Sequence, residues 1–83
     1  MEHYLFTAHN VTRAQRMAQV LSDSRITASI QRLPVGLSDR GCAYGVRVSE
    51  YDMARALSVM QSRQLSPVKV FYHTPYGYKE VSL

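Results

Sequence analysis

Residues 26–48 read ITASIQRLPVGLSDRGCAYGVRV, and two short alternating segments within this stretch decide the fold. Apolar and polar residues alternate over 26–31, and the same alternation returns over 44–48. A period of two is typical of a half-buried strand. Pro34 and Gly36 interrupt the pattern between the two segments. The stretch therefore predicts two consecutive strands joined by a loop, with no helix between them.

Helical patterns flank this pair of strands on both sides. Asn10 can cap a helix on the upstream side, and Ser49 with Asp52 resembles a capping box on the downstream side. Further strands are predicted over residues 3–8 and 68–73. The two apolar stripes at helical spacing are Val11, Ala14, Met17, Ala18 and Leu21, and Met53, Ala56, Leu57 and Met60.

The predicted order is β-α-β-β-α-β, which is the signature of an α+β, ferredoxin-like fold. We expect two helices on one face of a four-stranded antiparallel sheet. Within it, we expect the first and third strands to be parallel neighbours, with the fourth beside the first. Residues 1–74 form the predicted domain, and residues 75–83 form a tail expected to be irregular because it contains Pro75 and Gly77.

Composition narrows the function classes. The chain has 83 residues, 46% of them hydrophobic, and no apolar run approaches the ~20 residues of a membrane helix. No signal peptide is recognisable, and a single cysteine fits the reducing cytoplasm. The formal charge is +4, but the arginines are scattered along the chain, which argues against a nucleic-acid interface.

Cys42 is the side chain most capable of covalent chemistry. It follows Arg40 and Gly41 at the end of the predicted loop, where nearby cations lower the pKa of a thiol from its free value of about 8.5. The alternative is a small buried apolar residue at the end of a strand. No phosphate-binding loop and no paired metal-ligand motif is present, so the sequence indicates neither a cofactor nor a metal.

Two histidines are candidate assistants of this thiol. The expected strand order places Cys42, His3 and His73 at the same end of the sheet, with His3 nearer to the thiol and His9 at the other end. A cysteine–histidine pair is a means of forming thiolate. The alternative, which the sequence favours, is that both histidines are exposed residues at strand ends.

The chain is also expected to form a homodimer. Tyrosines in the tail suit an intersubunit contact, although they can equally fold back on the small core. The sheet face away from the helices stays open unless a partner covers it, and it carries Phe71, Leu33 and Thr27.

The segments Tyr4-Leu5-Phe6-Thr7, Arg32-Leu33-Pro34 with Ser38 and Cys42, and Val46-Arg47-Val48 together resemble the selenium/sulfur (Se/S) carrier protein-like family of short bacterial proteins. The resemblance covers about residues 3–72. It aligns Cys42 with the family's cysteine, Pro34 with its loop proline and Arg47 with its strand arginine. Ala43 stands where members often have glycine, and residues 38–41 replace a run of serines.

The resemblance implies a carrier that holds sulfur or selenium on Cys42 as a persulfide or selenosulfide. It would receive the atom from a donor protein and pass it to an acceptor protein, with Arg40 assisting thiolate formation. A carrier is favoured over an autonomous enzyme because no acid–base set accompanies the cysteine. The alternative is a non-catalytic ligand-sensing or protein-interaction module of the same fold.

Overall fold

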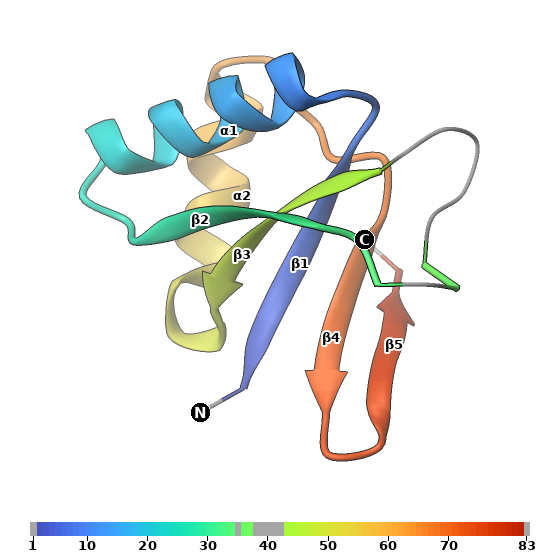
Figure 1. Cartoon of the computed structure of the whole chain (residues 1–83). Coiled ribbons are helices and arrows are strands. Elements are labelled where there is room, and N and C mark those ends of the chain that lie inside the picture. Colours follow the sequence, from blue (N-terminus) through green and yellow to red (C-terminus); the bar gives the residue numbers. More distant parts are fainter. Residues whose placement is uncertain (1, 35, 38–42, 83) are drawn as a thin grey trace.

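The computed structural model describes residues 2–34, 36–37 and 43–82, which form an antiparallel sheet and two helices (Figure 1). Five strands lie in the order β2-β3-β1-β4-β5. The elements along the chain are β1 (His3–Ala8), α1 (Val11–Asp23), β2 (Ala28–Arg32), β3 (Tyr44–Ser49), a 3-10 helix (Glu50–Asp52), α2 (Met53–Ser62), β4 (Val70–Thr74) and β5 (Gly77–Val81).

The α+β class and the order of the first six main elements are as the sequence predicts. Figure 1 shows α1 and α2 together on one side of the sheet. Neither helix is long and apolar enough to cross a membrane, in the part of the chain that the structure describes.

The direction of β3 corrects one prediction. β1 and β3 are antiparallel neighbours, with His3 opposite Ser49 and Ala8 opposite Tyr44, so the expected parallel pairing is wrong. The reason lies in the connections. Helix α1 carries the chain back so that β2 runs in the same direction as β1, and the following loop reverses it. A strand inserted between β1 and β2 must then oppose both.

The tail corrects a second prediction. Residues expected to be irregular instead form β5, which pairs with β4 from Thr74 opposite Gly77 to Val70 opposite Val81. Pro75 and Gly77 belong to the tight turn of this hairpin, and Gly77 adopts φ +122°, a conformation that favours glycine. The sheet therefore has five strands rather than four.

The core lies between the helices and the inner face of the sheet. Phe6 on β1 is fully buried, with Val46 of β3 on one side and Val70 of β4 on the other. Met17 of α1 and Met60 of α2 belong to the same buried cluster. Burial on this scale is the main driving force for folding of so short a chain.

The sheet face away from the helices is less open than expected. Phe71, predicted to be exposed, is buried, and Leu5 beside it is fully buried. Leu33 is half-buried, and Thr27 is exposed as predicted. A Cβ atom on Gly45 would lie 2.9 Å from Leu33 Cδ2 and 3.0 Å from Leu5 Cδ1. Glycine therefore lets both leucines close over β3.

Side-chain caps mark the start of α1 and of the 3-10 helix that precedes α2, whereas α2 itself has none. The Asn10 side chain accepts a hydrogen bond from the Arg13 backbone N–H at 2.8 Å, as predicted. Ser49 caps the 3-10 helix before α2, but its hydroxyl accepts from the N–H of Tyr51 rather than of Asp52. These two caps thus mark where α1 and the 3-10 helix start.

Both helices also end in the same way. Arg25 after α1 and Gln64 after α2 adopt positive φ values of 61° and 57°. The N–H of the next residue, Ile26 or Leu65, donates to a carbonyl near the end of its helix at 2.9 Å. These are Schellman-type ends, in which glycine is the usual left-handed residue.

Replacing Gln64 by glycine should therefore stabilise the protein. Gln64→Gly removes the left-handed strain of a side chain, and we expect the free energy of unfolding to rise by about 0.5–1 kcal/mol after the entropy cost of glycine. Arg63→Gly is the matched control, because Arg63 has φ −107° and gains no such relief. Denaturant unfolding measures both, and a Gln64→Gly variant no more stable than Arg63→Gly contradicts the prediction.

Candidate functional site

Cys42 and Arg40 lie outside the described residues, so their placement stays a prediction. The residues on either side of their loop are defined. The backbone N–H of Leu33 donates to the carbonyl of Ala43 at 2.9 Å, and the Arg32 guanidinium lies over the Tyr44 ring at 5.6 Å from its centroid. The chain therefore enters and leaves the loop at one end of the β2–β3 pair.

His3 and His73 share one end of the sheet, as expected. Their rings stack with centroids 4.6 Å apart and planes inclined by 12°. His3 Nε2 lies 3.0 Å from the Tyr78 hydroxyl, and His73 Nδ1 lies 3.2 Å from Glu2 Oε2. His3 is only 7% exposed. The interpretation of both histidines as exposed strand-end residues is therefore wrong for His3.

The same topology removes the argument that joined these histidines to Cys42. Tyr44, the first residue of β3, faces Ala8 at the end of β1, whereas His3 faces Ser49 at the other end of β3. The predicted proximity depended on a parallel pairing that does not occur. The structure thus unites His3, His73, Glu2 and Tyr78, which form a cluster of their own.

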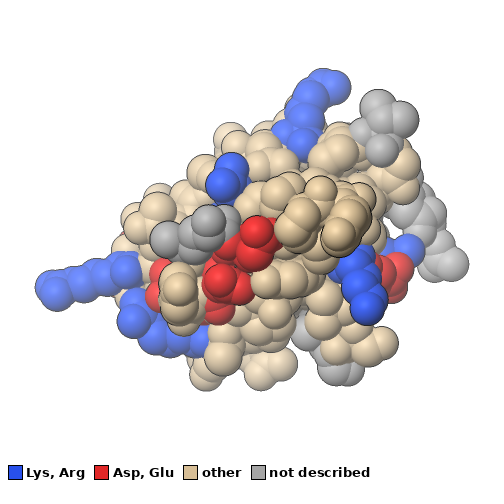
Figure 2. Space-filling view, turned by 90° about the horizontal axis from the view of Figure 1, so that it is seen from below, with Lys and Arg blue, Asp and Glu red and all other residues tan. Residues whose placement is uncertain are grey.

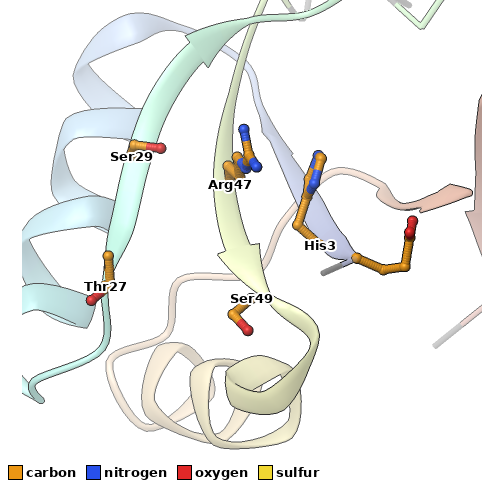
Figure 3. Close-up of a pocket in the computed structure, with 6 residues that line it drawn as sticks. His3, Thr27, Ser29, Arg47 and Ser49 are labelled. Carbon is orange, nitrogen blue, oxygen red and sulfur yellow. The ribbon is translucent and has the colours of Figure 1, made fainter.

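A hollow of about 270 Å³ adjoins this cluster on the face of the sheet away from the helices. Figure 3 shows Arg47 on β3 between Ser29 on β2 and His3 on β1. Its lining consists of Glu2, His3, Thr27, Ser29, Arg47 and Ser49. The hollow is therefore polar, with one guanidinium, one imidazole, three hydroxyls and one carboxyl group.

Burial and positive charge act together on His3. Its pKa is lowered from the usual 6.5, first by burial and then by the neighbouring Arg47 and His73, while Glu2 acts in the opposite direction. Burial and the neighbouring positive charges therefore favour the neutral form of the His3 ring.

Elsewhere at this end of the molecule, the hydroxyl of Tyr72 donates to Glu50 Oε2 at 2.9 Å. This hydrogen bond raises the pKa of the Tyr72 hydroxyl to about 12.

Figure 2 views the molecule from below, where acidic side chains lie near the centre and at the right, and Lys and Arg side chains form separate groups at the top, the right and the lower left. The visible face therefore shows no continuous basic patch.

Sequence reasoning missed the hollow, although a signal was present. Its residues are the polar members of the alternating strand patterns, and correct strand directions place them on one face. Arg47 was singled out in the sequence only through the family resemblance. Tyr78 was assigned to the tail that was expected to be irregular. Among residues 2–34, 36–37 and 43–82, no group of three His, Cys, Asp or Glu side chains could hold a metal ion.

A comparison with known protein families identifies a match. The family described as "Putative Se/S carrier protein-like" matches residues 3–72. The chain belongs to this family. The match to the Se/S carrier protein-like family confirms the resemblance seen in the sequence, runs from β1 into β4, and includes Cys42. No curated protein and no solved structure matches the chain.

The lowered pKa of His3 makes a prediction about stability. As the pH falls below about 6.5, the unfolded chain takes up this proton before the folded chain does, so the free energy of unfolding should fall until the folded pKa is reached. His3→Gln removes the titrating ring and should flatten this part of the curve, which begins near pH 6.5 and extends downward.

Thermal and urea unfolding across this pH range would measure the effect. His9→Gln, at an exposed histidine outside the cluster, is the matched variant. Parent and His3→Gln curves that differ only by a constant offset would show that His3 does not cause the slope.

Proposed function

We propose that this Se/S carrier-like protein carries sulfur or selenium on the thiolate of Cys42. The observation that supports the proposal is the family match over residues 3–72, which includes the only cysteine of the chain. A single thiol suits a carrier, because no second cysteine can displace the cargo by forming an internal disulfide.

The chemistry requires no outside oxidant. The Cys42 thiolate attacks the terminal sulfur of a donor persulfide, the donor's S–S bond breaks, and the donor leaves as a thiolate while Cys42 becomes a persulfide. An acceptor thiolate then attacks the same terminal atom, and Cys42 returns to its thiolate form. A terminal selenium is transferred by the same two displacements through a selenosulfide.

The framework around the loop supports this role. The β2–β3 ladder and the bond between Leu33 and Ala43 fix both ends of the loop. We propose that Arg40, the nearest charge in sequence, favours the thiolate. His3 and His73 have no part in this proposal. Their cluster lies beside Ser49, at the far end of β3 from Tyr44. The proposal includes a ferredoxin-like fold extended by β5 and a cytoplasmic location, where thiols stay reduced.

Loading with a small persulfide tests the function. We expect the protein incubated with glutathione persulfide to gain the mass of one sulfur atom, to lose it with excess dithiothreitol, and to gain nothing as Cys42→Ala. Arg40→Ala should load more slowly at neutral pH, because a smaller fraction of the thiol is ionised. Intact-protein mass spectrometry measures extent and rate.

Two controls keep this test specific. Arg63→Ala removes the same charge from the end of α2 and should load at the parent rate. The chain unfolded in urea supplies an unassisted cysteine as the reference. A folded protein that loads no faster than this reference would overturn the carrier proposal, and an Arg40→Ala variant with the parent rate would remove Arg40 from it.

We also propose that the protein forms a homodimer. The apolar face first suggested as the contact is largely covered, since Leu5 and Phe71 are buried. The edge strand β2 remains, with Ile30 38% exposed. Sedimentation should show a species heavier than the 9.4 kDa chain at high concentration, and Ile30→Lys should shift it toward monomer. A parent that remains monomeric across a wide concentration range contradicts the dimer.

A further inference from the structure

Strand register alone brings a set of polar groups together on the face away from the helices. Ser29 of β2 pairs with Arg47 of β3, and His3 of β1 pairs with Ser49 of β3. Side chains that face each other across strands have Cβ atoms about 4.5–5.5 Å apart. Thr27, just before β2, completes the group at the same end. The hollow is thus lined by backbone-fixed neighbours from three adjacent strands.

Arg47 is the cation of this group. Its side chain is exposed, and within the described part of the chain its guanidinium has no hydrogen-bond or ion-pair partner. Figure 3 shows it standing between Ser29 and His3. A guanidinium presents several N–H donors in a planar fork that fits carboxylates and tetrahedral oxyanions.

The nearby carboxylate does not neutralise Arg47. Glu2 lines the same hollow, but its Oε2 lies 3.2 Å from His73 Nδ1. The Nε2 of His3 faces the Tyr78 hydroxyl at 3.0 Å. Glu2 and His3 therefore have partners of their own, and the Arg47 guanidinium remains available beside the hydroxyl of Ser29.

From these observations we propose that the hollow is a binding site for a small anion with a carboxylate or tetrahedral oxyanion head. Arg47 is the principal ligand, with Ser29 as a neighbouring hydrogen-bond donor. The site does not depend on the carrier proposal, because it lies toward the Ser49 end of β3 whereas Cys42 precedes the Tyr44 end. Cys42→Ser should therefore bind the anion as the parent does.

Acetate and sulfate are suitable probes, titrated separately into labelled protein at constant ionic strength maintained with chloride. We expect saturable NMR shifts of the backbone amides of Ser29, Arg47 and Ser49 and of the Arg47 side chain. The stronger probe identifies the preferred head group. Arg47→Gln should weaken binding about tenfold or more, since a hydrogen bond to a charged group is lost. Arg63→Gln removes the same charge from α2 and should bind normally.

A second variant protects the test against misfolding of Arg47→Gln. Ser29→Asp places a carboxylate directly opposite Arg47 on the exposed face. This carboxylate should pair with the guanidinium and prevent anion binding, while the NMR spectrum remains that of a folded protein. Glu2→Gln removes the competing negative charge and should tighten binding. Shifts that never saturate, or that persist equally in Arg47→Gln and Ser29→Asp, would overturn the proposal.

Discussion

The pairing of β1 on both of its edges is the constraint on which the rest of the structure depends. Phe6 lies at its centre, fully buried between Val46 and Val70, and it meets the helices from below. Loss of such an aromatic side chain typically costs about 3–5 kcal/mol, a large part of the stability of a small domain. Because β1 pairs with β3 on one edge and with β4 on the other, the Phe6 contact joins both flanking strands to the core beneath the helices.

The sheet face away from the helices has two different regions along β3. Leu5 and Leu33 close over Gly45, so the half of this face near the start of β3 is apolar and covered. Farther along β3 the side chains become polar, and the face opens into the hollow around Arg47. One alternating strand thus builds a hydrophobic contact and a charged depression only two residues apart, which explains why a small sheet can bear a polar site without losing its core.

Sequence patterns predicted the helices, the first four strands and the Asn10 cap, because periodicity and capping are local properties. The direction of β3 and the pairing of β5 depend on contacts between distant residues, so they were predicted incorrectly. Pro75 and Gly77 were interpreted as breakers, whereas they form a turn between two strands. The placement of His3 and His73 at one end of the sheet followed from the expected position of β4 beside β1. Their stacking was not predicted, and neither was the contact of His3 with Tyr78, which belongs to the missed strand. The position of Cys42 within its loop remains a prediction.

The last strand also changes what counts as the complete folding unit. The family match ends at residue 72, yet β5 lies beyond it and supplies the hydroxyl that meets the buried ring of His3. A fragment cut at that boundary would lose the hairpin partner of β4 and leave a buried imidazole nitrogen without its partner, a loss that typically costs about 1–3 kcal/mol. The segment that the family model matches is therefore shorter than the sheet, and expression of a fragment that keeps the β4–β5 hairpin should extend through Val81.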